Sequence, residues 1–195
     1  MVASFTLPLQ KMKTMNALPD LNFLKECFII DPSASSGLRW VSKRPLNHFK
    51  NSANWRTWHA RYAGKSCGYL CMQKYFRLIL NNIKYPVHRI IFAIHNNTTD
   101  FLDKQIDHID GNKSNNSAQN LRLASASQNQ FNRKRQRNNA TGHKNISFIK
   151  KSNRYHCAIR VNGKDIFVGL FDTVEEAVIK RDLKTKELMG EYCRS

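Results

Sequence analysis

The first half of the chain alternates apolar runs with polar segments, a pattern that predicts several short elements. Residues 20–30 have the apolar spacing of a helix, which Asp31-Pro32 should end because proline disfavours helical geometry in the preceding residue. Residues 33–66 show little periodicity, so we expect them to be mostly irregular apart from a short strand at 38–40. Three strands should follow at residues 69–72, 75–80 and 83–85, and an Asn81-Asn82 turn should join the last two.

A short helix is expected next, because apolar residues fall at i, i+3, i+4 and i+7. These residues are Val87, Ile90, Ile91 and Ile94. Pro86 suits the start of this helix, which should bury the apolar stripe. His88 and His95 are expected on the opposite side, too far apart to bind one metal together, so we favour a structural or DNA-facing role for them.

The middle of the chain predicts two strands joined by an asparagine-rich loop and followed by a helix. Residues 105–112 have the pattern of a strand running into an Asp-Gly turn, and residues 120–123 that of a second short strand. Ser125 and Gln128 have the spacing of a capping box, which should start a helix that reaches about residue 137.

The C-terminal part predicts a three-stranded antiparallel sheet with one helix on it. The strands are expected at residues 145–149, 155–161 and 165–171, with Asn162-Gly163 as a hairpin turn. A capping box at Thr173 and Glu176 should start a helix that runs to Met189 and stops at Gly190. One set of second-strand residues should pack on this helix: Tyr155, Cys157, Ile159 and Val161, against Val174, Ala177, Val178 and Leu188. The alternate set should form an open face: His156, Ala158 and Arg160.

These elements predict an α+β fold in three parts. Residues 1–66 are expected to be an N-terminal docking and largely irregular region. Residues 67–139 should hold a small sheet followed by the strand, loop, strand and helix unit. Residues 140–195 should form the three-stranded sheet packed on one helix.

Composition makes a polyanionic partner the first expectation. The 195 residues include 41% hydrophobic residues, enough to bury a core, and carry a formal net charge of +18. Nucleic acid fits this charge better than a membrane surface, because no stretch is long and apolar enough to span a bilayer and no long basic amphipathic helix is evident. No small-molecule substrate is expected.

The N-terminus and the cysteines indicate a cytoplasmic location. Lys11 and Lys13 are not followed by the apolar run of a signal peptide. The five cysteines are odd in number and scattered, and only Cys67 and Cys71 have near metal-ligand spacing, so we expect the cysteines to be small buried hydrophobes rather than a metal site.

Acidic residues are absent from two long stretches of the chain. Residues 32–99 and 111–164 contain no Asp or Glu, although together they carry 23 Lys and Arg. Between them lie four aspartates: Asp100, Asp103, Asp107 and Asp110. Carboxylates inside a phosphate-binding field are costly unless a cation sits between them and the phosphate. The alternative is an acidic loop that simply faces solvent.

The segment from Ile106 to Arg133 resembles the ββα-metal core of phage His-Asn-His homing endonucleases. The likeness rests on I-D-H-I-D-G-N followed by N-L-R and the helical Q-N-Q-F-N-R, and on the upstream Val87-His88-Arg89. Counted from Val87, the likeness covers about 45 residues. The resemblance implies an endonuclease that hydrolyses phosphodiester bonds of double-stranded DNA to 5′-phosphate and 3′-hydroxyl ends.

The same resemblance implies a role for each motif residue. His108 would be the general base, because a neutral imidazole accepts a proton near neutral pH. Asp107 and Asn129 would hold one divalent cation, and such oxygen ligands favour Mg²⁺ or Mn²⁺. Asn120 would bind the loop backbone or His108 and so fix the imidazole. Asp107 and His108 can serve one site only if the chain bends after the strand, as the Asp-Gly turn allows.

Alternatives remain open for several asparagines. Asn132 lies on the same helical face as Asn129 and could replace it as a metal ligand. Asn112, Asn115 and Asn116 are more simply interpreted as turn-capping residues.

Basic residues around the motif are expected to contact DNA. Besides Arg122, the predicted helix ends in Arg133, Lys134, Arg135 and Arg137, for which a nuclear-localisation signal is the alternative interpretation. Phosphate contact is the simpler role.

The C-terminal part resembles the DNA-binding domain of plant ethylene-response factors. T-G-H-K-N-I, Y-H-C-A-I-R and V-G-L-F-D-T-V-E-E-A carry this likeness. It implies DNA-facing positions at Lys144, Ser147, Arg160 and Phe167, although Ser147, Phe167 and Asp165 depart from the plant pattern. Phosphate contacts are predicted for Lys144, Lys150, Lys151, Arg154 and Arg160.

A homing-type DNA endonuclease is therefore the leading hypothesis. A DNA-binding regulator with an inactive nuclease fold is the alternative, and an RNA-binding module is disfavoured because no aromatic platform is evident. One motif set implies one active centre per chain, so a monomer should nick DNA, whereas a weak homodimer could cut both strands.

Overall fold

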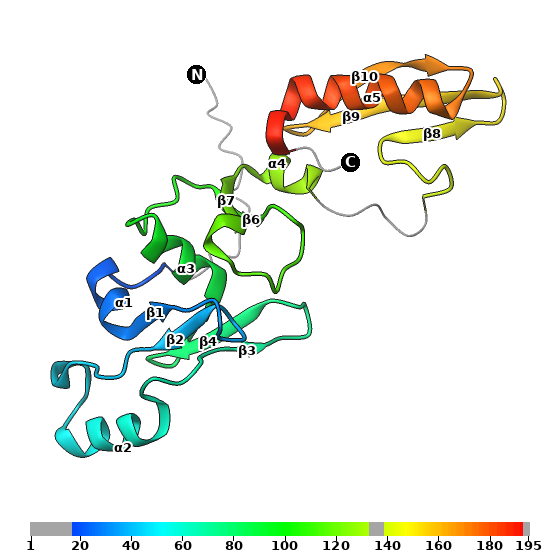
Figure 1. Ribbon diagram of the computed structural model, residues 1–195. Coiled ribbons are helices and arrows are strands. Elements are labelled where there is room, and N and C mark those ends of the chain that lie inside the picture. The colour runs from blue at the N-terminus through cyan, green and yellow to red at the C-terminus, as the bar shows by residue number, and fades with distance from the viewer. Residues whose placement is uncertain (1–16, 133–138, 193–195) are drawn as a thin grey trace, which may run out of the picture.

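The computed structural model describes residues 17–132 and 139–192, which form an α+β fold with four small antiparallel sheets (Figure 1). The first sheet pairs β1 with β2, the second has the order β3-β4-β5, the third pairs β6 with β7, and the fourth has the order β10-β9-β8. The α+β class expected from the sequence is confirmed.

The N-terminal helix is shorter than predicted. Asp20 caps α1 (Leu21–Cys27) by accepting hydrogen bonds from the backbone of Asn22 and Phe23. The predicted last turn is instead strand β1 (Phe28–Ile30), which pairs with β2 (Leu38–Trp40). The helical prediction failed there because pairing with β2 buries Phe28 and outweighs the local helical pattern.

The segment predicted to be irregular contains a helix. A single 3-10 turn, η1 (Leu46–His48), is followed by α2 (Ser52–Tyr62), whose N-cap Asn51 accepts from the backbone of Asn54. None of the residues of α2 is fully buried, so the helix has no apolar stripe of the usual kind. Its aromatic residues do recur at i, i+3, i+4 and i+7: Trp55, Trp58, His59 and Tyr62.

The second sheet leads directly into the central helix. Its strands are β3 (Tyr69–Leu70), β4 (Phe76–Leu80) and β5 (Ile83–Pro86), followed by α3 (Val87–His95). Asn81 and Asn82 have φ of 50° and 62°, as a tight hairpin turn requires, and this turn was predicted. Val87, Ile90 and Ile91 are fully buried in α3, as expected.

One hydrophobic core joins the N-terminal region to the central elements. Its buried residues come from both sides of residue 66, and they include Leu24, Leu38, Leu78, Ile90 and Leu121. Helix α3 contacts α1, β1, β4 to β7 and η2, so it is the element around which these small pieces are assembled.

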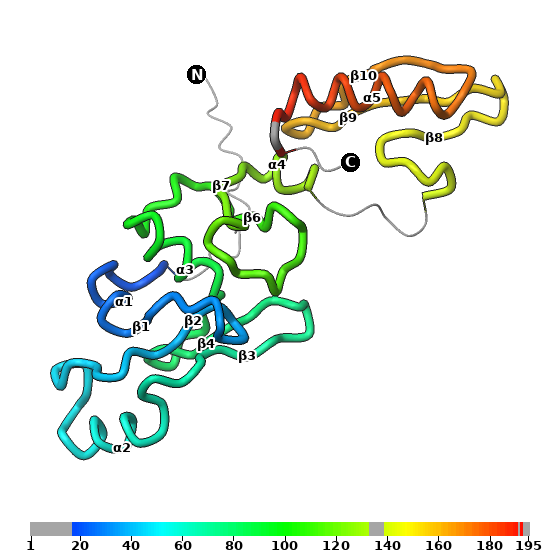
Figure 2. Tube along the Cα trace, viewed as in Figure 1, coloured from blue at the N-terminus to red at the C-terminus, as the bar shows by residue number. Residues whose placement is uncertain are grey.

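The third sheet and its helix form the unit predicted from the middle of the chain. Its elements are β6 (Gln105–His108), η2 (Ala118–Asn120), β7 (Leu121–Ala124) and α4 (Ala126–Phe131). The capping box of Ser125 and Gln128 is present, with both reciprocal hydrogen bonds. Figure 2 shows the loop between β6 and β7 reaching back toward the β3–β4 hairpin.

The C-terminal sheet is covered on one face by α5 (Figure 1). Its elements are β8 (Ile146–Ile149), β9 (Arg154–Val161), β10 (Lys164–Phe171), α5 (Val174–Met189) and the 3-10 turn η3 (Gly190–Tyr192). Cys157 and Ile159 are fully buried, and Ala177 of α5 packs in the same cluster as Cys157. Thr173 caps α5, as the sequence predicted.

Three of the cysteines are buried: Cys27, Cys67 and Cys157. Cys71 is partly exposed, and Cys193 lies outside the described residues, as do Lys11 and Lys13. In the part of the chain that the structure describes, no helix is long and apolar enough to cross a membrane.

Candidate active site

The end of β6 places two adjacent polar side chains in one pocket. Asp107 and His108 are 5% and 4% exposed, and both line a cavity of about 560 Å³. The chain bends immediately after them, because Gly111 adopts a φ of 65° and its amide donates to the carbonyl of His108. The structure therefore brings these predicted site residues together. Asn129 and Asn132 of the following segment line the same cavity.

Asp107 is held from two sides. Nε of Arg122 lies 3.2 Å from its Oδ2, and Nδ2 of Asn132 lies 2.9 and 3.1 Å from its two oxygens. Arg122 lies opposite Asp107 in the β6–β7 register, and its guanidinium also lies 4.1 Å from the ring of Tyr192. The Arg122 side chain is only 12% exposed, so its nearest role is to hold Asp107. The DNA contact predicted for Arg122 stays a prediction.

His108 has its ring fixed by Asn116. Nε2 of His108 lies 3.0 Å from Oδ1 of Asn116, while Nδ2 of Asn116 donates to the carbonyl of Ser36. Because the amide Oδ1 can only accept, Nε2 of His108 carries the proton and the lone pair lies on Nδ1. Burial lowers the pKa of His108, although Asn116, Asp110 and Asp107 act in the opposite direction. His108 is therefore neutral at neutral pH.

Asn120 belongs to a network that shapes the loop between β6 and β7. Its Oδ1 accepts from the backbone of Asp110, and its Nδ2 donates to Oδ1 of Asp110 and to the carbonyl of Asn115. Burial tends to raise the pKa of Asp110, but the hydrogen bonds from Asn115, Asn120 and Asn112 lower it overall. Of the two partners predicted for Asn120, the structure places it on the loop backbone and not on His108.

A second histidine lies behind the candidate base. The ring of His88 lies 5.1 Å from that of His108 and 5.3 Å from that of Tyr75. Burial lowers the pKa of His88 to about 3, with smaller contributions from His108, Arg89 and Arg77. His88 was predicted to lie opposite the buried stripe of α3, yet it is 8% exposed because the β3–β4 hairpin and β6 cover that side of the helix.

The donor set of the pocket fits a hard divalent cation. The described residues contain no group of three His, Cys, Asp or Glu side chains arranged for a metal, so a cation bound here would need amide oxygens as further ligands. Asp107, Asn129 and Asn132 offer one carboxylate and two amides on the same cavity. Nδ2 of Asn129 donates to Gln105, which leaves its Oδ1 for another partner. Such oxygen donors suit Mg²⁺ or Mn²⁺, which keep several water ligands.

The predicted DNA-contacting residues are placed differently from one another. Ser147, Lys150, Lys151 and Phe167 are exposed on or beside the C-terminal sheet. Arg154 pairs with Asp172 at 2.8 Å, and Arg160 with Asp165 at 3.8 Å, both on the surface. The Lys144 ammonium donates to the carbonyl of Phe131 at the end of α4. Some predicted contacts fall outside the described residues: Arg133, Lys134, Arg135 and Arg137.

Several residues of this site were missed by the sequence analysis. Asn116 was interpreted as a turn-capping residue, but it is 4% exposed and bound to His108. Tyr75 and Lys113 line the pocket, with the Lys113 ammonium 4.8 Å from the Tyr75 ring. Of the residues around the pocket that were not predicted as site residues, only His88 could have been found from the sequence, because it belongs to the Val-His-Arg segment upstream of the motif.

Comparison with known proteins places this site within a described family. Residues 85–131 match the HNH endonuclease family model. The chain is 36% identical over 109 residues to an uncharacterized HNH endonuclease of Acanthamoeba polyphaga mimivirus, an alignment that covers 56% of each chain. It is 34% identical over 90 residues to protein 3.8 of Escherichia phage T7, covering 46% of this chain and 73% of that protein. No solved structure matches the chain significantly.

Proposed function

Because this chain carries an HNH endonuclease domain and belongs to one family with protein 3.8 of phage T7, we propose that it is a metal-dependent DNA endonuclease. The observation that carries the proposal is the pocket that holds Asp107, His108 and the two helical asparagines together. The β6, β7 and α4 unit would then be the ββα-metal core of the enzyme. The substrate we propose is double-stranded DNA.

His108 supplies the proton acceptor of this reaction. Its neutral ring presents a lone pair on Nδ1, while Asn116 holds the proton on Nε2. A water molecule transfers a proton to Nδ1 as its oxygen attacks phosphorus. The bond from phosphorus to the 3′-oxygen breaks, and the 3′-oxygen takes up a proton from solvent. The products carry a 5′-phosphate and a 3′-hydroxyl.

Asp107 and the helical asparagines are the proposed ligands of Mg²⁺ or Mn²⁺, with either Asn129 or Asn132 as the second ligand. When bound, the cation would stabilise the negative charge that develops on the phosphate. Lys113 lines the same pocket, and its ammonium would add a positive charge for a phosphate oxygen. The ion pair with Arg122 holds the Asp107 carboxylate in place at the wall of the cavity.

The open face of the C-terminal sheet is the proposed second DNA contact. Phe167 is 60% exposed, its ring lies 5.4 Å from that of His156, and Ser147 pairs with His156 in register. Helix α5 covers the other face, so this one remains available to a DNA groove. The likeness to plant ethylene-response factors supports this placement. With one active centre per chain, a monomer would nick DNA.

The test is cleavage of a plasmid that carries the DNA flanking the gene. We expect cleavage with Mg²⁺ or Mn²⁺, none with a chelator, and ends that a ligase rejoins directly because they carry 5′-phosphate and 3′-hydroxyl groups. The proposal is wrong if the purified protein binds this DNA but leaves it intact with every divalent cation. That result would favour a DNA-binding regulator.

A further inference from the structure

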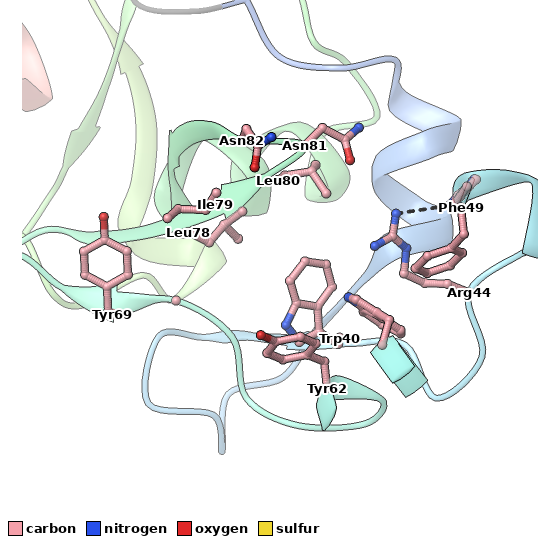
Figure 3. A pocket seen from close by; sticks show the side chains of 13 residues that line it. Trp40, Arg44, Phe49, Tyr62, Tyr69, Leu78, Ile79, Leu80, Asn81 and Asn82 are labelled. Carbon is pink, nitrogen blue, oxygen red and sulfur yellow. Dashed lines mark hydrogen bonds between the residues drawn. The ribbon is translucent and has the colours of Figure 1, made fainter. Parts of the chain in front are cut away.

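A second cavity lies between α2 and the second sheet, outside the proposed active site. It has a volume of about 590 Å³. Figure 3 shows Trp40 and Tyr62 on one side, Leu78 to Asn82 of β4 and its turn on the other, and Arg44 with Phe49 at one end. The cavity is large enough for one nucleobase with its sugar.

Arg44 is a buried cation without a carboxylate partner among the described residues. It is 4% exposed, and its guanidinium carbon lies 4.8 to 5.8 Å from four aromatic ring centroids, those of Phe23, Trp40, Phe49 and Trp58. Its Nε has no hydrogen-bond partner, and its Nη2 reaches Nδ1 of His48 at 3.5 Å. The carboxylate of Glu26 pairs with the other ring nitrogen of His48 and not with Arg44. A buried guanidinium without an anionic partner is costly, and a bound anion would offset that cost.

The walls of the cavity are aromatic and partly open to solvent. Trp40 and Trp58 meet edge to face with centroids 5.2 Å apart, and the Tyr62 ring lies 6.0 Å from that of Trp58. Tyr62 and Ile79 are 40% and 52% exposed although both line the cavity. Exposed aromatic surface beside a cation is the chemistry that binds an unstacked base and its phosphate.

The polar groups at the rim and the surrounding charge also favour the binding of a nucleotide. Asn81 and Asn82 form the tight turn at the rim, where Figure 3 shows their amides above the cavity. Amide groups both donate and accept, so they can bind the polar edge of a base. The sequence from residue 32 to residue 99 contains no acid, and the carboxylate of Glu26 is paired with His48, so the positive charge of Arg44 remains available to a phosphate.

The β3–β4 hairpin connects this cavity to the active-site pocket. Tyr75, the residue just before β4, lines the active-site pocket, and Leu78 to Leu80 of β4 line the second cavity. Five residues of extended strand span about 17 Å. A DNA strand bound at His108 could therefore reach the second cavity within a few nucleotides.

We propose that this cavity binds one unpaired nucleotide of the DNA substrate, with its base among Trp40, Trp58 and Tyr62 and its phosphate near Arg44. The proposal rests on the proposed endonuclease function for the identity of the polymer. It adds a site that recognises a base displaced from the duplex, away from the bond that is cut. The energy of unstacking would be offset by the aromatic contacts and by the anion that Arg44 lacks.

The experiment compares two duplexes of the same sequence, one perfectly paired and one with a single unpaired thymidine, bound to the full chain in the presence of a chelator. We expect the wild type to bind the duplex with the unpaired base about tenfold more tightly, because stacking of one base has an effect of this order. Tryptophan fluorescence should be quenched more by that duplex, since Trp40 and Trp58 line the cavity.

Matched variants separate the cavity from a general preference for flexible DNA. Tyr62→Ala and Ile79→Ala alter exposed side chains and should remove the preference while leaving binding of the paired duplex unchanged. Tyr62→Phe should keep it. Ile29→Ala, an exposed apolar residue of β1 outside the cavity, should also keep it. Arg44→Gln should weaken it, if circular dichroism shows that this variant folds.

Equal affinity for the two duplexes would overturn the proposal, and so would a preference that survives Tyr62→Ala and Ile79→Ala. Because the assay contains no free divalent metal, it does not depend on cleavage, and His108→Ala should retain the preference. A chain that cuts DNA without this preference would keep the proposed function and lose only the inference. A chain that prefers the unpaired base but never cuts DNA would keep the inference and lose the proposed function.

Discussion

Among single residues, Asn116 determines how the candidate base is oriented. Its amide joins the carbonyl of Ser36 to Nε2 of His108, so a residue 80 positions upstream in the sequence orients the candidate base. The orientation matters because only one ring nitrogen of a neutral imidazole can accept a proton.

Asn116→Ala is expected to lower the cleavage rate about ten- to a hundredfold while DNA affinity stays unchanged, because the imidazole loses the partner that fixes its tautomer. Asn116→Asp should shift the acidic limb of the pH–rate profile upward, since a carboxylate next to Nε2 stabilises the protonated ring. Single-turnover cleavage across pH 5 to 8 measures both effects. An Asn116→Asp profile that coincides with the wild type would show that Asn116 does not act through His108.

His88 should make the fold sensitive to acid. Burial holds its pKa at about 3 in the folded chain, against 6.5 for an exposed histidine, so below pH 6.5 the unfolded chain binds a proton that the folded chain does not. The contribution of the neutral ring is complete above pH 6.5 and is lost as the pH falls toward 3. The slope reaches at most about 1.4 kcal/mol per pH unit.

His88→Phe should therefore flatten the decline of the free energy of unfolding between pH 6.5 and 4. Urea denaturation of both proteins at several pH values gives the comparison. Parallel curves for wild type and variant would mean that His88 is protonated in the folded chain or exposed in solution.

Among the elements, the contact between η3 and β7 links the C-terminal module to the active site. Tyr192 stacks on Arg122, the ion-pair partner of Asp107, and its hydroxyl donates to the carbonyl of Leu123 at 2.9 Å. The turn η3 at the end of α5 thus supports Arg122, which holds the proposed metal ligand Asp107.

Tyr192→Ala should destabilise the fold by about 1 to 3 kcal/mol, because it removes a cation–π contact and a hydrogen bond. It should also slow cleavage, since Arg122 loses the ring that packs it against Asp107. Tyr192→Phe, which keeps the ring, should lose only the hydrogen-bond part and retain most of the activity. If both variants cleave at the wild-type rate, the C-terminal turn has no influence on Asp107.

The elements that depend on local chemistry were predicted well from the sequence. Those that depend on packing against distant residues were predicted poorly. The Asn81-Asn82 and Asn162-Gly163 turns and the caps at Ser125 and Thr173 are local, and all are present. Residues 28–30 follow a helical pattern but form a strand, because their pairing partner lies at residues 38–40. Helix α2 was missed because its periodic residues are aromatic and only partly buried.

At the scale of the whole molecule, charge predicted a class of partner, while only the fold reveals how the site is completed. The adjacent Asp107 and His108 and the following asparagines could be found by their spacing. Asn116 could not, since its contact with His108 depends on the path of an irregular loop and on Ser36. The cavity around Arg44 could not be foreseen either, because its walls come from β2, α2 and the second sheet.

The positive charge of the chain also means that DNA binding alone is weak evidence for a nuclease. A net charge of +18 attracts phosphates whether or not His108 takes part in chemistry. The decisive comparison must hold binding constant and change only the proposed base.

The most direct measurement is the single-turnover cleavage rate of wild type and His108→Ala on the same DNA with Mg²⁺, at protein concentrations that saturate the DNA in both cases. We expect His108→Ala to bind DNA as the wild type does but to cleave it at least about a hundredfold more slowly, because the attacking water loses its proton acceptor. Cleavage by His108→Ala at the wild-type rate would show that His108 is not the proton acceptor and that the reaction takes place elsewhere.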